Sequence, residues 1–320
     1  MTNDAAARDI GVFEQHRTRL FGIAYRMLGS VQDAEDVVQE AYLRWHEADA
    51  AAVRAPEGWL VAVTTRLSID RLRRAATERE RYAGTWLPEP IATGPAFDAD
   101  RRAELASDLS MAFLVLLERL TPEERAALLL RDVFDTGYDE IARVLERSET
   151  ACRQLVHRAR VRVRGERARF PVAPETKERL LEQFLAALRA DDQDTVLALV
   201  AEDATWLSDG GGKVPATRRV VRGADRIARL LLSLERKGRG LVEHRVAWIN
   251  GEPALVTYAG DRVLFTTSVA TDGERLVEFY RVLNPEKLRH AVAAGHNPAA
   301  TTSIGYGPRH ESNRGKGPPT

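Results

Sequence analysis

The chain has 320 residues, 44% of them hydrophobic, and its 47 Lys and Arg balance its 47 Asp and Glu. This length suits two or three globular domains, and no apolar run approaches the roughly 18 residues that cross a bilayer. The N-terminus lacks the basic-then-apolar pattern of a signal peptide, and the single cysteine, Cys152, excludes a disulfide framework and a multi-cysteine metal site. We therefore expect a cytoplasmic protein that enters no membrane and needs no metal and no cofactor.

The charge is spread unevenly along the chain. Residues 1–50 hold five Arg against nine Asp and Glu, whereas residues 147–169 hold eight Arg against two Glu. A local excess of arginine is typical of a surface that meets nucleic acid, although a charge-rich helix is often only a solvated face. The neutral total therefore does not exclude a nucleic-acid partner.

Residues 10–82 show helical periodicity throughout. FEQHRTRLFGIAYRML has apolar residues at helical spacing and ends at Gly29-Ser30, DAEDVVQEAYLRWHEA follows with an acidic first turn, and a third helix starts at Pro56. The second of these helices has a polar side and an apolar side. The polar side consists of Asp33, Asp36, Gln39 and Glu40, and the apolar side of Val37, Val38, Ala41 and Trp45. The polar side is either a docking surface or a solvated acidic face.

Residues 83–104 predict a linker, because three prolines and two glycines fall within positions 83–100. The linker contains the string WLPEP, which consists of Trp86, Leu87, Pro88, Glu89 and Pro90. Its prolines favour a rigid, extended segment that offers the Trp86 ring and the Glu89 carboxylate to a partner surface.

Residues 105–168 are again helical and contain a helix-turn-helix pattern. Thr121 caps a helix that has Pro122 at its first position. Further on, a short helix in GYDEIARVLER, a tight turn and a second helix capped by Ser148 follow one another. Glu146 occupies the turn position where a glycine is usual, so the turn must form with a non-glycine residue.

The second helix of this pattern has a basic outer face. Its apolar stripe is Ala151, Leu155, Val156 and Ala159, and the residues on or near the opposite face are Arg153, Gln154, His157, Arg158 and Arg160. Arginine pairs with guanine edges or phosphates, and glutamine pairs with adenine. The pattern therefore predicts a helix that reads DNA.

Residues 175–290 change in character and predict a mixed domain. Two helices, a glycine-rich loop and a helix near 223–237 precede four strand-like runs, LVEHRVAWI, PALVTYAG, DRVLFTTSVA and RLVEFYRVL, with turns at Asn250-Gly251, Gly260-Asp261 and Asp272-Gly273. Residues 291–320 predict a disordered tail.

The loop DGGGK lacks the spacing of a phosphate-binding P-loop, so its three glycines indicate close approach to another surface.

The order and spacing of two motifs resemble a known family. LERLTPEERAALLLRDVFDTGYDEIARVLERSETACRQLVHRAR resembles region four of an extracytoplasmic-function (ECF) sigma factor, and FGIAYRMLGSVQDAEDVVQEAYLRW with GWLVAVTTRLSIDRLRR resembles region two. The remainder resembles a SnoaL-like domain of the NTF2-like fold. The fold class that this implies is multi-domain: two all-α sigma domains at 10–82 and 105–168, and an α+β cone at 175–290.

The resemblance implies a function for each region. A member of this family binds core RNA polymerase through its β′ clamp and β flap, recognises the −35 and −10 elements of promoter DNA, and starts transcription without being an enzyme. Asp33, Asp36, Gln39 and Glu40 would contact polymerase, and Arg153, Gln154, His157, Arg158 and Arg160 the −35 element. The residues implied for the −10 element are Trp59, Arg66, Asp70, Arg73 and Arg74. Many members have Asn where this chain has Arg66, so their −10 preference does not transfer, and Trp59 is expected mainly to pack in the core.

Three strings resemble markers of the subgroup that carries a C-terminal extension, and they imply regulation within the chain. We expect the extension to touch the sigma regions near WLPEP, with a charge pair between Lys213 and Glu89. The residues expected at this contact, besides WLPEP, are Asp209, Gly210, Gly211, Gly212 and Lys213 of DGGGK, and Asn284, Pro285, Glu286, Lys287 and Leu288 of NPEKL.

An alternative function remains open at this point. Trp206, Asp209, His244, Tyr258 and Tyr280 are candidates to line a pocket in the C-terminal domain, where a small ligand would bind. An Asp–His pair in such a pocket would do general acid–base work. The chain would then be a helix-turn-helix regulator or a small-molecule enzyme whose NTF2-like domain binds a ligand.

Overall fold

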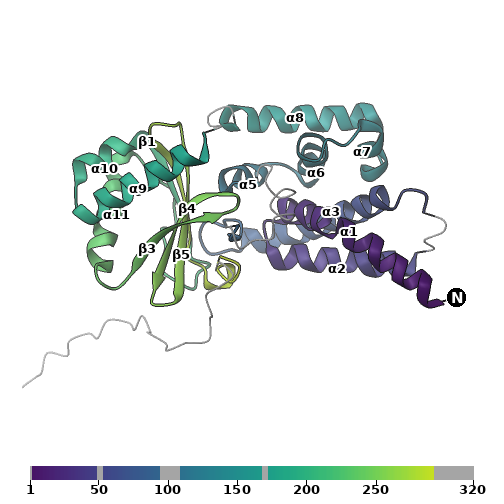
Figure 1. Ribbon diagram of the computed structural model, residues 1–320. Helices are drawn as coiled ribbons and strands as arrows, with labels where there is room; N and C mark the ends of the chain where they lie inside the picture. Colours follow the sequence, from purple (N-terminus) through teal and green to yellow (C-terminus); the bar gives the residue numbers. More distant parts are fainter. Residues whose placement is uncertain (1, 49–52, 94–108, 168–171, 292–320) are drawn as a thin grey trace, which may run out of the picture.

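The computed structural model describes residues 2–48, 53–93, 109–167 and 172–291, which form a helical lobe followed by a lobe built on a sheet (Figure 1). The tail predicted for 291–320 lies outside the described residues except for Ala291, as do residues 94–104 of the predicted linker. Within the described part, no helix is long and apolar enough to cross a membrane.

The helical lobe begins with the three helices that the sequence predicts: α1 (Thr2–Leu28), α2 (Val31–Glu47) and α3 (Pro56–Glu80). α1 ends where Gly29 takes a left-handed conformation with φ of +66°. The Ser30 hydroxyl then caps α2 by accepting a hydrogen bond from the Asp33 amide at 3.3 Å. The apolar side predicted for α2 is buried in the core of this lobe.

The second half of the helical lobe consists of short helices and one long helix. These are α5 (Met111–Leu117), α6 (Pro122–Leu128), the π-helical turn η1 (Leu129–Val133), α7 (Tyr138–Leu145) and α8 (Glu149–Arg167). Thr121 and Glu124 form a capping box at the start of α6, with side-chain-to-amide distances of 3.3 and 3.2 Å. The predicted cap at Thr121 and the position of Pro122 are confirmed.

The turn between α7 and α8 forms without a glycine. Glu146 adopts the left-handed conformation, φ 53° and ψ 47°, that a glycine would supply more easily. Ser148 caps α8, because its hydroxyl accepts a hydrogen bond from the Ala151 amide at 3.2 Å. Val144 and Cys152, one from each helix, are buried in the same hydrophobic cluster. The local sequence therefore fixes the helix-turn-helix despite the strained residue.

The second lobe contains three helices and a six-stranded sheet with strand order β2-β1-β6-β5-β4-β3. The helices are α9 (Pro174–Ala190), α10 (Gln193–Leu199) and α11 (Ala224–Gly238). The strands are β1 (Val200–Asp209), β2 (Val221–Arg222), β3 (Glu243–Ile249), β4 (Glu252–Ala259), β5 (Arg262–Thr271) and β6 (Leu276–Val282), and a 3₁₀ turn, η2 (Pro285–Lys287), follows. β1 and β6 pair in parallel, and the other neighbours are antiparallel.

The four predicted strand runs and their turns are confirmed, but the pattern did not predict β1 and β2. Asn250 and Gly251 both have positive φ, 53° and 76°, as the tight turn between β3 and β4 requires. β1 escaped the pattern because exposed Glu202 and Asp203 interrupt its alternation, where the pairing with β6 is irregular. The helix-plus-sheet fold class expected for this region is confirmed.

The two faces of the sheet pack against different parts of the chain. Trp206, Leu255 and Phe279 lie on the face that α9, α10 and α11 cover, which we call the helix face. Tyr280 and Val282 lie on the opposite face, which we call the linker face, and they pack in a cluster with Leu87, Met111 and Leu288. The linker face therefore packs on residues from the sigma-like half of the chain.

Residues 86–93, which we call the strap, lie between the two lobes. On one side, the Glu89 amide donates to the Gly29 carbonyl at 2.8 Å. On the other side, Ile91 and Asn250 exchange two hydrogen bonds, of 2.8 and 3.0 Å, and Ala92 forms a β-bridge with Ile249. The strap thus joins the end of α1 to the β3–β4 turn.

Substituting Gly29 by Ala should destabilise the protein more than substituting Gly260. Both residues have positive φ, +66° and +56°, so each Ala carries a left-handed strain of about 1–2 kcal/mol. Only at Gly29 would the new Cβ lie 2.6 Å from the Trp86 ring, whereas nothing lies within 4 Å of it at Gly260. Overpacking should add about 1–3 kcal/mol to the loss for Gly29→Ala. Urea unfolding of both variants checks this, and equal losses would contradict a tightly packed strap.

Candidate functional site

The arginines of α8 contact acidic residues of α6 and η1. Arg158 and Arg162 both pair with Glu124, at 3.2 and 2.5 Å, and Glu124 itself is almost fully buried. Arg160 forms a two-bond fork with Asp132, at 3.1 and 2.6 Å. These pairs brace the helix-turn-helix internally.

The remaining residues predicted for the outer face of α8 are exposed. Arg153 pairs with Glu149 at 3.1 Å, and its guanidinium lies 4.2 Å from the centre of the Tyr138 ring. Gln154 and His157 are exposed beside it. α8 lies at the edge of the helical lobe, away from α1 and α2 (Figure 1). The structure therefore places all five predicted residues on the exposed side of one helix, and the three predicted arginines also form ion pairs.

Arg66 on α3 binds the C-terminal end of α7. Its Nε and Nη2 donate to the carbonyls of Val144 and Arg143 at 2.8 and 2.7 Å, and its Nη1 pairs with Glu146 at 3.0 Å. A cation at a helix C-terminus satisfies carbonyls that have no partner within the helix. Arg66 therefore fastens the third helix of the chain to the turn of the helix-turn-helix.

The other residues predicted for the −10 element have mixed surroundings. Arg73 pairs with Asp70 on its own helix at 3.1 Å and with Glu123 of α6 at 2.5 Å. Arg74 is exposed. Trp59 is half-buried, with its ring 5.6 Å from that of Trp45, so it packs at the edge of the core as expected.

The polar side of α2 is partly engaged by an arginine that the sequence pattern did not single out. Arg71 of α3 pairs with Asp33 and Asp36 at 2.5 and 3.1 Å. Glu40 pairs with Arg44 one turn further along the same helix, and Gln39 is exposed. The four predicted residues share one accessible side of α2.

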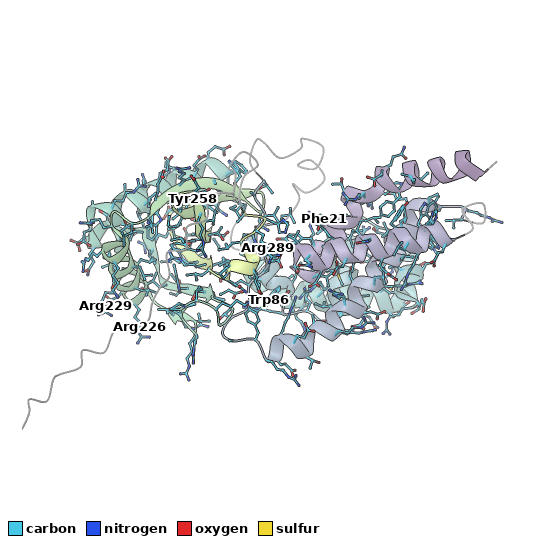
Figure 2. The ribbon with its side chains drawn as sticks, turned by 90° about the horizontal axis from the view of Figure 1, so that it is seen from below. Phe21, Trp86, Arg226, Arg229, Tyr258 and Arg289 are labelled. Carbon is cyan, nitrogen blue, oxygen red and sulfur yellow. The ribbon has the colours of Figure 1, made fainter. Side chains whose placement is uncertain are left out.

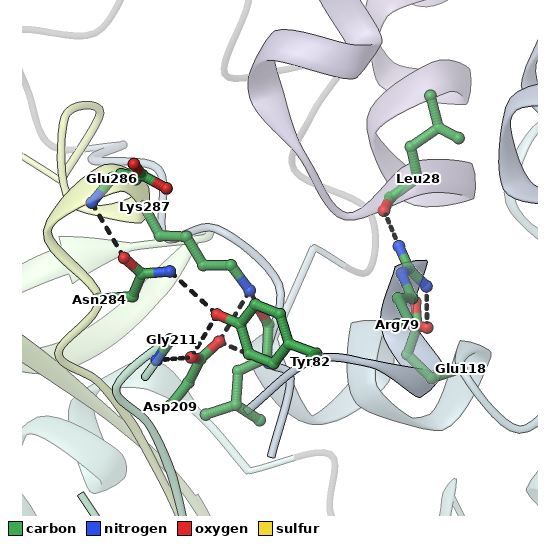
Figure 3. Close-up of polar contacts among 10 residues, drawn as sticks. Leu28, Arg79, Tyr82, Glu118, Asp209, Gly211, Asn284, Glu286 and Lys287 are labelled. Carbon is green, nitrogen blue, oxygen red and sulfur yellow. Dashed lines mark hydrogen bonds and ion pairs between the residues drawn. The ribbon is translucent and has the colours of Figure 1, made fainter. Parts of the chain in front are cut away.

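Asp209, at the end of β1, is fully buried between the lobes and has four polar partners. Its carboxylate accepts hydrogen bonds from the Tyr82 hydroxyl at 2.6 Å and from the Leu87 and Gly211 amides at 2.9 and 3.0 Å. The fourth partner is the Lys287 ammonium, 2.7 Å away (Figure 3). These contacts bring WLPEP, DGGGK and NPEKL together around one carboxylate.

Lys287 completes this cluster from the C-terminal side. Its ammonium also donates to the Leu87 carbonyl at 2.5 Å and lies 4.1 Å from the centre of the Trp86 ring. Burial lowers the pKa of Lys287, and the charge of Asp209 opposes that shift. Arg79 lies over the same Trp86 ring at 3.7 Å, so two cations contact the indole. Trp86 lies where the lobes meet (Figure 2).

The glycines of DGGGK allow the loop to approach its neighbours closely. A Cβ on Gly212 would lie 2.9 Å from Ala83, and one on Gly211 would overlap the amide of Asn284. Asn284 in turn donates to the Tyr82 hydroxyl at 2.9 Å and accepts from the Glu286 amide. Of the other predicted contact residues, Leu288 is buried in the linker-face cluster.

The charge pair expected between Lys213 and Glu89 is wrong. Lys213 pairs with Glu286, at the surface of the same lobe. Glu89 instead accepts a hydrogen bond from the Val31 amide at 3.0 Å, where its carboxylate lies at the N-terminal end of α2. The expected proximity of the two segments was not enough to predict this pair, because Lys213 and Glu89 each have a different partner.

The Asp–His pair considered for acid–base chemistry is also wrong. Asp209 belongs to the contact between the lobes, whereas His244 pairs with Glu235 at 2.9 Å and with Thr257 at 2.8 Å on the helix face. Tyr258 and Tyr280 lie on the linker face, so the five pocket candidates are divided between opposite sides of the sheet. Alternation along the strands produces this division.

Two residues that hold the strap, Tyr25 and Asn250, were not predicted as contact residues from the sequence. Tyr25 is fully buried, donates to the Glu89 carbonyl at 2.5 Å and accepts from the Asn250 side chain at 2.7 Å. Asn250 was singled out only as a turn residue. An Asn-Gly pair is already accounted for by the turn, so nothing in the sequence indicated that the Asn250 side chain would also bind Tyr25.

Comparison with known proteins gives the same division of the chain. Residues 12–78 match the family Sigma-70 region 2, and residues 110–163 match Sigma-70, region 4. The first match spans α1 to α3 and the second spans α5 to most of α8. Two such regions in this order, with the helix-turn-helix in the second, define a sigma factor.

The chain belongs to the ECF RNA polymerase sigma factors. It is 39% identical over 292 residues to the ECF RNA polymerase sigma factor SigJ of Mycobacterium tuberculosis, which covers 88% of this chain and 93% of that protein. It is 30% identical to the probable ECF sigma factor SigI of the same species, over 85% of this chain and 92% of that protein. The crystal structure of M. tuberculosis SigJ superposes with a TM-score of 0.72 at 36% identity, covering 87% of this chain and 98% of that one.

Replacing Asp209 by Ala should destabilise the contact between the lobes strongly. The change leaves the Lys287 ammonium buried without its carboxylate, which costs about 3–5 kcal/mol for a buried pair. Glu286→Ala is the matched control, since it breaks an exposed pair of the same lobe and should leave the free energy of unfolding nearly unchanged. Urea unfolding of the full chain measures both, and similar losses for the two variants would contradict the central role of Asp209.

Proposed function

We propose that the chain recruits core RNA polymerase to promoters in the cytoplasm, as a sigma factor with no chemistry of its own. One observation carries this proposal. Region two has an accessible acidic side on α2, and region four has an exposed basic side on α8. An acidic helix side suits a basic surface on the β′ clamp of polymerase. The short region four suits the β flap, to which the family resemblance assigns it.

The proposal divides promoter recognition between the two regions. α8 enters the major groove at the −35 element, where Arg153, Gln154 and His157 lie on its exposed side. Arg158 and Arg160, whose own side chains are about half exposed, exchange their carboxylate partners for phosphate or base contacts. On α3, Arg66, Asp70, Arg73 and Arg74 track the displaced strand of the −10 element.

The arrangement described here is then the closed, DNA-free form. Arg66 and Arg73 bind region four through Val144, Glu146 and Glu123. The same guanidinium groups cannot hold these groups and DNA at the same time. Promoter binding therefore requires the two sigma regions to separate, and the contacts of Arg66 and Arg73 oppose that separation.

The C-terminal domain regulates this equilibrium in the proposal. It holds the strap through Asp209 and Lys287, and the strap holds the end of α1 and the start of α2 through Glu89. A tethered domain acts at high effective concentration, so modest contacts are sufficient to bias the closed form. The domain thus takes the role that a separate inhibitory protein would otherwise have.

Reversing the charge of the acidic side of α2 should weaken binding to polymerase. We expect Asp36→Arg with Glu40→Arg to lower the affinity for core polymerase at least about tenfold, because like charges then meet in the interface. Pull-down with core polymerase and run-off transcription measure the effect. The matched control is Glu182→Arg with Asp194→Arg, two exposed acids of the C-terminal domain. Unchanged affinity with a normal circular dichroism spectrum would contradict the proposed docking side.

A substitution in region four that weakens the closed form should increase binding of the −10 single strand. In Glu123→Lys, the new ammonium faces Arg73 of α3 and repels it, so we expect about two- to tenfold more binding of −10 single strands by the holoenzyme. Asp139→Lys is the control, since Asp139 also lies in the first turn of its helix but has its ion pair with Arg143 on that same helix. A result in which both variants behave like the wild type would refute the proposed inhibition by region four.

A further inference from the structure

A buried cation on the helix face of the sheet forms no ion pair within the described residues. Arg281 of β6 is 91% buried, since its exposed fraction is 9%. Its Nε donates to the Thr267 hydroxyl at 3.0 Å, and its guanidinium lies 4.1 Å from the centre of the Phe265 ring and 4.5 Å from that of Trp206. Within the described residues, Nη1 and Nη2 of Arg281 have no hydrogen-bond acceptor and the guanidinium has no ion pair.

A second donor beside Arg281 is also without an acceptor. Trp206 of β1 is 1% exposed, and its indole Nε1 is buried with no hydrogen-bond partner in the part of the chain that the structure describes. Buried indole N–H groups normally have a partner. Two neighbouring strands therefore bring a cation and an orphaned N–H donor to the same place.

One acid acts on the guanidinium through its charge without forming an ion pair with it. Glu235 of α11 is the one acid whose charge affects the pKa of Arg281, which burial lowers to about 9. The Glu235 carboxylate is bound by His244 at 2.9 Å. His244 is itself engaged on its other ring nitrogen by Thr257. Neither Glu235 nor His244 forms a hydrogen bond or ion pair with Arg281 among the described residues.

An unpaired buried cation is expensive, and an anion of suitable shape would remove the cost. A desolvated charge costs several kcal/mol unless an opposite charge or hydrogen bonds compensate it. A guanidinium with two outer nitrogens available matches the two oxygens of a carboxylate. The neighbouring rings of Phe265 and Trp206 favour a flat apolar body attached to that carboxylate.

We propose that the helix face of the C-terminal sheet binds a small aromatic or apolar carboxylate. Arg281 is its anchor through Nη1 and Nη2, and the Trp206 indole N–H is a third donor. Thr267 orients the guanidinium by accepting from its Nε. The ligand is accordingly an organic acid and not a neutral molecule of the same shape.

Benzoate and benzamide test the charge requirement on the full chain. Titration calorimetry and thermal unfolding should detect benzoate binding and a raised Tm for the wild type, with no effect of benzamide. Arg281→Gln should weaken benzoate binding at least about tenfold, as expected when a charged hydrogen-bonding partner is lost. The control is Arg262→Gln, which removes an exposed arginine of β5 and should bind benzoate like the wild type.

A readout that needs no Arg281 variant comes from the tryptophan itself. The indole N–H resonance that disappears in Trp206→Phe belongs to Trp206, and benzoate should shift it in the wild-type spectrum whereas benzamide should not. In buffer without carboxylates, Arg281→Gln should unfold at the same or a higher temperature than the wild type, because it removes an unpaired buried charge. The proposal is overturned if benzoate neither shifts this resonance nor raises Tm, or if it stabilises Arg281→Gln as much as the wild type.

Discussion

The buried ion pair between Asp209 and Lys287 is the constraint on which the arrangement of the lobes depends. Both groups are removed from water, so each must satisfy nearly all of its hydrogen-bonding capacity locally. The cluster achieves this with one hydroxyl and the backbone of the strap and of the glycine loop. All of these hydrogen bonds form together only when the strap and the glycine loop occupy the positions seen here. The pair therefore fixes where the strap lies, and the strap fixes where the sheet lobe meets α1.

In the two states that we propose, the same arginines of the helical lobe would serve in different contacts. Arg66 satisfies carbonyls at the end of α7, and Arg160 satisfies Asp132, in positions that remain about half exposed. Exposed charge pairs contribute little to stability and exchange partners readily. Arginine presents the same planar fork to a carboxylate, a carbonyl or a phosphate. In the closed form that we propose, Arg66 and Arg73 would hold region four through contacts that DNA can replace.

The sequence predicted elements better than contacts. Caps at Thr121 and Ser148, the Asn250-Gly251 turn and the apolar side of α2 follow from local rules, and all are confirmed. β1 was missed because its acids break the alternation, and the Lys213–Glu89 pair was wrong because long-range partners depend on the final packing. Tyr25 illustrates the limit most clearly. As one aromatic residue in an apolar helix pattern, it gave no sign that its hydroxyl would join the strap to Asn250.

The same two strands serve both faces of the sheet, which ties the interior of the C-terminal domain to its outer contact. β1 places Trp206 on the helix face and Asp209 on the linker face, three residues apart. β6 places Arg281 on the helix face and leads directly into Asn284 and Lys287. Because β1 and β6 pair in parallel with Ser208 beside Arg281, a shift of either strand moves both sites together. An anion drawn to Arg281 would therefore act on the strands that hold the strap, without any contact with the sigma regions.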